Sequence, residues 1–161
     1  MPRCAFIGLG VMGSPMAGYL QNAGNQTTVY NRTVSKAEKW VEAYGGSLGA
    51  TPCEAAQDAD VVMLCVGNDD DVRSVVYGES GVLAGMTSGS VLVDHTTASA
   101  FLAKELEEAC AEKGIGFVDA PISGGQAGAE SGQLSVMCGG SQEAFSKIEQ
   151  VIEVYSKISI L

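Results

Sequence analysis

The segment Cys4-Ala5-Phe6-Ile7-Gly8-Leu9-Gly10-Val11-Met12-Gly13 carries the glycine pattern G-x-G-x-x-G and decides the fold. Residues 4–7 are an apolar run of strand type, and from residue 11 to 24 apolar side chains recur at helical spacing. The glycines therefore lie at a strand-to-helix turn, the context that a dinucleotide-binding motif requires. In such a turn the backbone approaches a pyrophosphate, and the N–H groups and dipole of the helix N-terminus stabilise its charge. The residues expected to bind the pyrophosphate are Gly8, Leu9, Gly10, Val11, Met12 and Gly13.

The next expected strand, residues 26–30, ends at Asn31-Arg32-Thr33. Proteins that bind NAD(H) carry an acidic residue near this point, which accepts hydrogen bonds from the ribose 2′-hydroxyl. Here a neutral amide is followed by a guanidinium, which binds a 2′-phosphate through two parallel hydrogen bonds. The sequence therefore favours NADP(H) and leaves NAD(H) possible, with Asn31, Arg32 and Thr33 at the adenosine end. The alternative is that Arg32 is a solvated charge at a strand end.

The composition fits one globular domain of 161 residues, with 46% hydrophobic and 17% charged residues. A net charge of −10 argues against nucleic-acid binding, although a local set of backbone amides can still bind an anionic cofactor. Four glycines and Pro15 interrupt the apolar N-terminus, so we expect no membrane span, no targeting segment and a cytoplasmic location. The five scattered cysteines form no C-x-x-C pair, so we predict neither a metal site nor a disulfide framework.

Strand and helix patterns alternate along the whole chain, which predicts an α/β fold: a Rossmann-type, doubly wound, mostly parallel sheet with helices on both faces. The expected strands are residues 4–7, 26–30, 47–48, 60–66, 91–94, 115–118, 134–138 and 158–161. The expected helices are residues 11–24, 34–44, a short one from Thr51-Pro52, 72–77, 101–113 and 141–155. Residues 81–89 and the glycine-rich stretch after Ser123 are interpreted as loops.

Three further strand ends carry polar or glycine residues, and ligands of doubly wound sheets bind beyond such ends. The turn Val66-Gly67-Asn68 is expected to donate backbone N–H groups to the middle of the cofactor, with an ordinary solvent loop as the equal alternative. His95, the only histidine, is interpreted as structural rather than catalytic. Thr96 and Thr97 are expected to cap a helix that begins near Ala98, and one of them could reach the nicotinamide ribose or a substrate carboxylate.

The loop Ser123-Gly124-Gly125 offers exposed backbone N–H groups and a hydroxyl, which suit a carboxylate. The alternative is a turn in which the glycines serve only the backbone conformation.

Three motifs together resemble the β-hydroxyacid dehydrogenases, the family of 3-hydroxyisobutyrate dehydrogenase and tartronate semialdehyde reductase. They are the glycine turn continued by Met16-Ala17 and Leu20, then Asn31-Arg32-Thr33, then residues 119–125 followed by Gly128-Ala129, Gly132 and Leu134. The resemblance implies hydride transfer between a nicotinamide cofactor and a small β-hydroxyacid, in a homo-oligomeric full-length protein. It also implies that Ser123, Gly124 and Gly125 bind the substrate carboxylate and that Thr97 contacts cofactor or substrate.

The family continues into a helical second domain that supplies a catalytic lysine, whereas this chain stops at Leu161. Its six lysines fall in helix patterns or near helix ends, away from the strand-end loops, so we expect no catalytic residue within it. Residues 1–161 are thus expected to form an NADP-binding Rossmann domain that does not turn over a hydroxyacid alone. The alternatives are a non-catalytic dinucleotide-sensing module and the N-terminal domain of an imine reductase.

Overall fold

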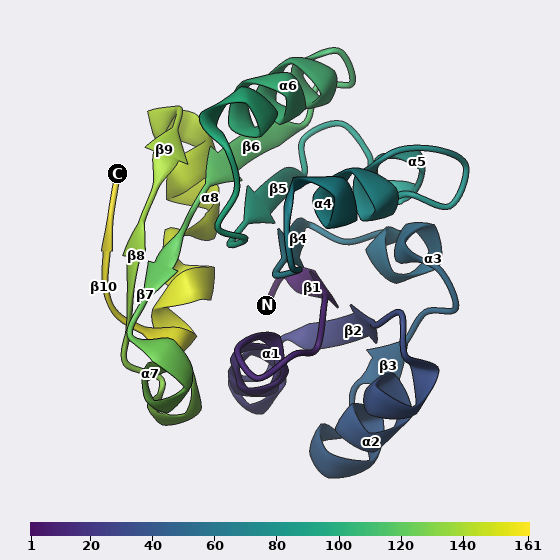
Figure 1. Ribbon diagram of the computed structural model, residues 1–161, viewed down its shortest axis with the longest axis vertical. Coiled ribbons are helices and arrows are strands. Elements are labelled where there is room, and N and C mark those ends of the chain that lie inside the picture. Colours follow the sequence, from purple (N-terminus) through teal and green to yellow (C-terminus); the bar gives the residue numbers. More distant parts are fainter.

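The computed structural model describes residues 1–161 and is built on one seven-stranded sheet (Figure 1). All neighbouring strands of this sheet are parallel except the last pair, which is antiparallel. In spatial order the strands are β3 (Ser47–Leu48), β2 (Gln26–Tyr30), β1 (Arg3–Ile7), β4 (Val61–Leu64), β5 (Val91–Asp94), β6 (Gly116–Asp119) and β9 (Gly139–Gly140). The order 3-2-1-4-5-6 is that of a doubly wound dinucleotide-binding sheet, so the predicted fold class is confirmed.

Helices cover both faces of this sheet (Figure 1). One face packs against α1 (Gly13–Asn22), α2 (Val34–Tyr44) and α8 (Gln142–Ile152). The other packs against α3 (Pro52–Ala56), α4 (Asp69–Val76), α5 (Val82–Gly85) and α6 (Ala100–Ala111). Successive strand residues point to opposite faces, so Phe6 belongs to the first of these cores and Ile7 to the second.

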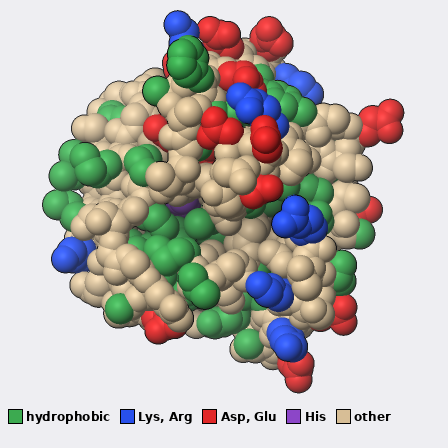
Figure 2. Space-filling view, viewed as in Figure 1, with side chains coloured by type: hydrophobic (Ala, Val, Ile, Leu, Met, Phe, Trp, Pro, Cys, Tyr) green, Lys and Arg blue, Asp and Glu red, His purple; other side chains and the backbone are tan.

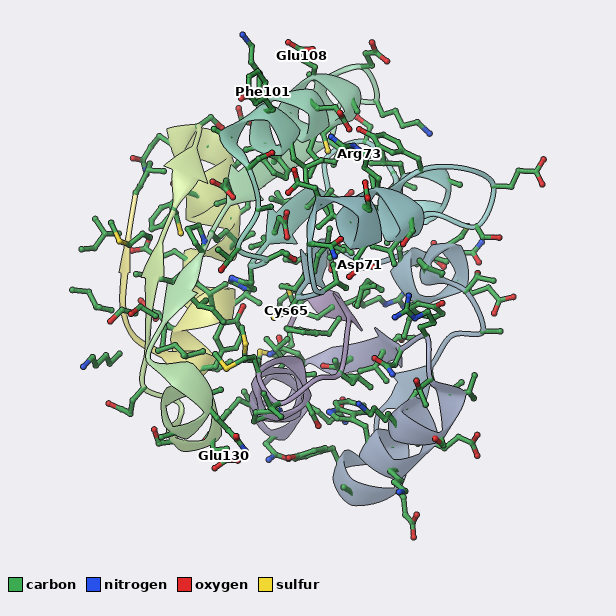
Figure 3. The ribbon with its side chains drawn as sticks, viewed as in Figure 1. Cys65, Asp71, Arg73, Phe101, Glu108 and Glu130 are labelled. Atoms are coloured by element: carbon green, nitrogen blue, oxygen red, sulfur yellow. The ribbon has the colours of Figure 1, made fainter.

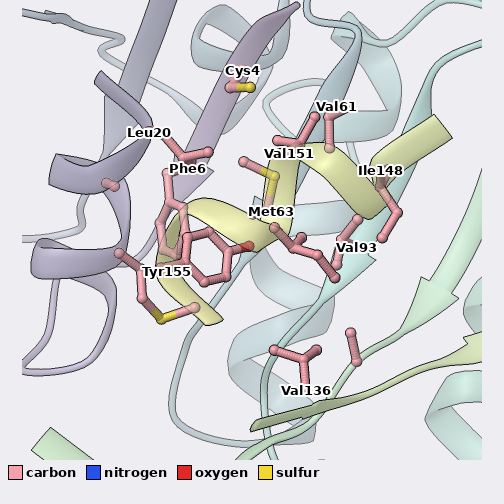
Figure 4. Close-up of a cluster of buried hydrophobic side chains, with 14 of the residues drawn as sticks. Cys4, Phe6, Leu20, Val61, Met63, Val93, Val136, Ile148, Val151 and Tyr155 are labelled. Carbon is pink, nitrogen blue, oxygen red and sulfur yellow. The ribbon is translucent and has the colours of Figure 1, made fainter. Parts of the chain in front are cut away.

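The first core is drawn in Figure 4, where Phe6, Met63 and Val93 of three neighbouring strands belong to one cluster with Ile148 of α8. Tyr155, in the short 3₁₀ helix Glu153–Tyr155 after α8, is completely buried among them. Because the central strands are buried on both sides, they read as continuous apolar runs rather than as alternating patterns.

A second, three-stranded sheet lies beside α8, on the left in Figure 1. Its order is β10 (Ser156–Ile160), β8 (Leu134–Met137) and β7 (Ile122–Ser123), with β10 parallel and β7 antiparallel to β8. The helix α7 (Gly125–Ser131) joins β7 to β8. The two last expected strands therefore exist, but in a separate sheet.

Several expected boundaries were wrong. Residues 81–89 contain α5, and the glycine-rich stretch after Ser123 contains α7, because helices of four and seven residues are too short to show a periodicity. The helix expected near Ala98 begins at Ala100, where the side chain of Ser99 accepts a hydrogen bond from the N–H of Leu102. Thr96 and Thr97 therefore do not cap it.

The helices expected to begin at Thr51 and Ser141 are capped by these two residues, since each side chain accepts a hydrogen bond from a backbone N–H three residues on. The helix expected over residues 72–77 starts earlier, at Asp69, because Asn68 caps it. None of the helices combines the length and apolar character needed to cross a lipid bilayer.

Candidate dinucleotide-binding site

A cavity of about 740 Å³ opens at the carboxyl ends of β1, β2 and β4. Its walls are the turn after β1, the turn after β2 with the first turn of α2, and one side of α4. The predicted cofactor-binding residues in its wall are Gly8, Leu9, Gly10, Val11, Met12, Gly13, Asn31, Arg32, Thr33, Val66 and Gly67. The predicted site residues outside it are Asn68, Thr97, Ser123, Gly124 and Gly125.

Each of the three glycines of the motif is needed for a different structural reason. Gly8 has a φ of +104°, and a Cβ there would collide with the carbonyl oxygen of Cys65. A Cβ on Gly13 would collide with the carbonyl oxygen of Gly8, so this glycine allows α1 to lie close to the end of β1. A Cβ on Gly10 would meet no atom within 4 Å and would stand in the open space that a ligand needs.

Two amides of the glycine turn are used within the protein. The N–H of Gly8 donates to the carbonyl oxygen of Tyr30 at 2.9 Å, and the N–H of Leu9 donates to Oδ1 of Asn31 at 2.9 Å. The four successive N–H groups of residues 10–13 have no partner within the protein. They line the cavity at the N-terminus of α1, so this wall offers four donors and the positive end of a helix dipole to an anion.

The turn after β2 supplies the cationic part of the cavity. The side chain of Arg32 is 89% exposed, and its Nη1 lies 4.0 Å from Oδ1 of Asp71 on α4. Lys36, in the first turn of α2, also lines the cavity, which corrects the expectation that all lysines lie away from the strand-end loops. Figure 2 shows Lys and Arg side chains over α2 and the end of β2, whereas acidic side chains crowd over α4 and α6.

The sequence did not identify Lys36 and Asp71 as residues of this cavity. The signal for Lys36 was its spacing, because a residue four positions after Arg32 lies near it once a helix begins at Val34. Asp71 had no such signal, since it is one of three successive aspartates and periodicity alone does not say which faces the cavity.

The turn Val66-Gly67-Asn68 differs from its expected role. The N–H of Val66 donates to Oγ1 of Thr96 at 3.1 Å, and Asn68, whose side chain caps α4, lies outside the cavity wall. Within this turn, only Gly67 has an unpartnered N–H and also lines the cavity. Thr96 is buried and holds this turn, whereas Thr97 is exposed beside it.

His95 is 1% exposed, and both of its ring nitrogens are bonded inside the protein. Nδ1 donates to the carbonyl oxygen of Ala120 and Nε2 accepts from the Tyr155 hydroxyl, each at 2.7 Å, because a carbonyl can only accept. Burial lowers the pKa of His95 to about 4, so the ring is neutral at pH 7. This geometry fits the structural role expected from the sequence.

Ser123, Gly124 and Gly125 are exposed, and the two glycines have φ values of +133° and +63°. A left-handed backbone conformation therefore does require glycine in this loop. The same loop leaves these residues accessible at the start of α7, so the conformational and the ligand-binding interpretations are compatible.

Burial raises the thiol pKa of four of the five cysteines, which opposes formation of the reactive thiolate. Burial raises the pKa of Cys4, Cys65 and Cys110 to about 12 and that of Cys138 to about 11. No three His, Cys, Asp or Glu side chains gather in a geometry that could hold a metal ion.

Comparisons with known proteins show which family and fold the chain resembles. The family model described as the NAD binding domain of 6-phosphogluconate dehydrogenase matches residues 3–161. An uncharacterized oxidoreductase of Shewanella frigidimarina is 56% identical over 161 residues, which are 100% of this chain and 55% of that protein. The 2-(hydroxymethyl)glutarate dehydrogenase of Eubacterium barkeri is 38% identical over 159 residues, 96% of this chain and 51% of that protein.

Among solved structures, the Mycobacterium tuberculosis 3-hydroxyisobutyrate dehydrogenase with L-serine superposes with a TM-score of 0.92 at 30% identity. The match covers 99% of this chain and 54% of that one. The chain thus spans about half the length of the curated relatives that it matches.

Proposed function

Because the chain belongs to the β-hydroxyacid dehydrogenase family, as its N-terminal NAD(P)-binding domain, we propose that it is the NADP(H)-binding half of an oxidoreductase. The full protein would interconvert a small β-hydroxyacid and its aldehyde or keto form by hydride transfer. The observation that carries this proposal is the row of four unpartnered N–H groups at residues 10–13, which line the cavity of about 740 Å³. The open space beside Gly10 supports close approach of a pyrophosphate.

The preference for NADP(H) is supported by charge at the far end of the cavity. Arg32 and Lys36 line the cavity beside the end of β2. In this fold, residues that follow the second strand bind the adenosine ribose or its 2′-phosphate. The strand-end residue Asn31 is an amide whose oxygen is already bonded to Leu9, so it offers no carboxylate to a ribose 2′-hydroxyl. A guanidinium and an ammonium together favour a phosphate dianion over a neutral hydroxyl.

For the chemical step, the nicotinamide supplies the hydride chemistry when bound. The residues of this chain would bind and orient the cofactor, while Ser123, Gly124 and Gly125 would hold the substrate carboxylate and Thr97 would contact cofactor or substrate. Hydride removal from a hydroxyl carbon also needs a group that takes the O–H proton. We assign that group to a lysine of a helical domain beyond residue 161, so the chain alone would bind cofactor without turnover. Homo-oligomerisation of the full protein and a cytoplasmic location are part of the same proposal.

Titration calorimetry of the chain with NADPH and NADH tests this proposal. NADPH should bind more tightly, and Arg32→Ala should weaken NADPH by about ten- to a hundredfold while changing NADH little, because charged hydrogen bonds contribute about 1.5–3 kcal/mol. Lys36→Ala should act in the same direction more weakly. Lys39→Ala is the matched control, since Lys39 is an exposed lysine of α2 outside the cavity wall.

A clear preference for NADH, or an equal loss of both cofactors in Arg32→Ala, would overturn the assignment of NADP(H). Binding of neither cofactor would overturn the proposed function itself.

A further inference from the structure

Three successive aspartates at the start of α4 have three different surroundings. The carboxylate of Asp69 accepts hydrogen bonds from the hydroxyl and the N–H of Ser99, at 2.6 and 2.9 Å. The side chain of Asp70 is 97% exposed and lies 3.6 Å from Arg73. The Asp71 side chain is 34% exposed and lines the cofactor cavity.

The position of Asp71 is built into the local structure. Its N–H donates to Oδ1 of Asn68 at 2.9 Å, which fixes it in the first turn of α4. Gly67 leaves room for the carboxylate, because a Cβ on that residue would collide with Oδ2 of Asp71. Figure 3 shows Asp71 and Arg73 on opposite sides of α4, with Arg73 toward α6 and Asp71 toward the end of β2.

The Asp71 carboxylate accepts no hydrogen bond from the protein, and its charged neighbour is Arg32, at 4.0 Å. That pair is weak, because the guanidinium is almost fully hydrated and the separation is long. A phosphate dianion that binds Arg32 with two hydrogen bonds would therefore displace the carboxylate from it. The carboxylate would remain beside the phosphate and repel it, whereas a ribose hydroxyl meets no such repulsion.

We infer that Asp71 is a specificity-determining residue. Its carboxylate stays beside the Arg32 guanidinium when no 2′-phosphate is present, and it reduces the difference by which NADP(H) binds more tightly than NAD(H). The inference rests on the proposed NADP(H) function. It predicts that this cavity admits NAD(H) as well, although one end of the cavity is cationic. Asp71 thus acts on selectivity through charge, and not through a bond to the cofactor.

The test is the affinity of the chain for NADPH and for NADH after Asp71→Asn. NADPH affinity should rise about three- to tenfold and NADH affinity should stay within about twofold, because only the 2′-phosphate meets the removed charge. The gain should shrink at about 0.5 M salt, where charges in a solvent-exposed mouth are screened. The thermal unfolding midpoint checks that the variant is folded.

Two further variants separate charge from other effects. Asp71→Ala removes the carboxylate without adding an amide donor, so a gain in NADPH affinity there reports loss of repulsion alone. Asp70→Asn makes the same change in net charge one residue away, on an exposed side chain turned toward Arg73, and should leave both affinities unchanged.

Each other outcome overturns the inference. An unchanged NADPH-to-NADH ratio in Asp71→Asn and Asp71→Ala would show that the carboxylate does not act on the phosphate. A loss of both affinities would show that Asp71 binds the cofactor directly. An equal gain in NADPH affinity in Asp70→Asn would show that the effect comes from the net charge of the chain and not from the position of Asp71. In all these cases the wild-type chain still prefers NADPH, whereas wild-type binding of neither cofactor would instead remove the proposed function.

Discussion

The backbone N–H of Leu9 donates a hydrogen bond of 2.9 Å to the side-chain oxygen of Asn31, 22 residues further along the chain. The amide nitrogen of Asn31 donates in turn to the carbonyl oxygen of Thr33 at 3.0 Å. The turn after β1, which would hold the pyrophosphate, is thereby tied to the turn after β2, which would hold the adenosine. The Asn31 side chain thus holds the two turns together through hydrogen bonds within the protein, whereas the side chain of the neighbouring Arg32 is exposed.

Asn31→Ala is expected to weaken NADPH and NADH alike, by about five- to thirtyfold. The substitution leaves the Leu9 N–H without its partner, at a cost of about 1–2 kcal/mol, and loosens the loop shared by both cofactors. Calorimetry with both cofactors checks this. Asn22→Ala, at an exposed asparagine at the end of α1, should change neither affinity. A selective loss of NADPH would contradict the shaping role.

Substitutions at Gly10 and Gly13 are expected to have different effects, one on cofactor binding and the other on the stability of the fold. Gly10→Ala should leave the unfolding midpoint almost unchanged and weaken both cofactors at least about tenfold, because its methyl group enters the ligand space. Gly13→Ala should lower stability by about 1–3 kcal/mol, since the methyl group collides with the Gly8 carbonyl. Thermal unfolding should show a decrease of about 2–4 °C for each kcal/mol lost. A destabilised Gly10→Ala with unaffected binding would refute this assignment.

The main sheet and the glycine turn after β1 could be predicted because their signals are local. A glycine pattern between an apolar run and a helical period specifies the turn after β1. The apolar run expected as a strand over residues 60–66 contains the buried central strand Val61–Leu64. Asn31-Arg32-Thr33 could be located because strand ends in this fold converge on one edge.

What could not be predicted depends on contacts between distant residues. In the second sheet Ser123 pairs with Ser135, and Ile160 pairs with Met137. The sequence pattern of these short segments does not indicate that they form a separate sheet. The direction of Asp71 toward Arg32 depends on where α4 begins, which the cap at Asn68 sets. Likewise, Thr96 resembles a helix cap in sequence, but in the fold its hydroxyl accepts from the N–H of Val66.

Asp94 and His95, adjacent at the carboxyl end of β5, respond to pH in opposite directions. Burial raises the pKa of Asp94 to about 6, although hydrogen bonds from Thr96 partly offset it. The folded protein thus holds a proton that the unfolded chain releases, so the contribution of Asp94 to stability falls as pH rises from about 4 to 6. Burial lowers the pKa of His95 to about 4, so its contribution is complete above about pH 6.5 and is lost as pH falls toward 4.

In the wild-type chain the effects of Asp94 and His95 on the pH dependence of stability largely cancel. We therefore expect a substitution of either residue alone to reveal the effect of the other. Relative to wild type, the unfolding free energy of Asp94→Asn should rise with pH between about 4 and 6, and that of His95→Gln should fall, each by up to about 1.4 kcal/mol per pH unit. Urea unfolding at several pH values measures both differences. Asn22→Ala, which changes an exposed side chain without a titratable group, should run parallel to wild type. If the Asp94 and His95 variants also run parallel to wild type, then these two buried groups do not change protonation on unfolding, and the opposed linkage is refuted.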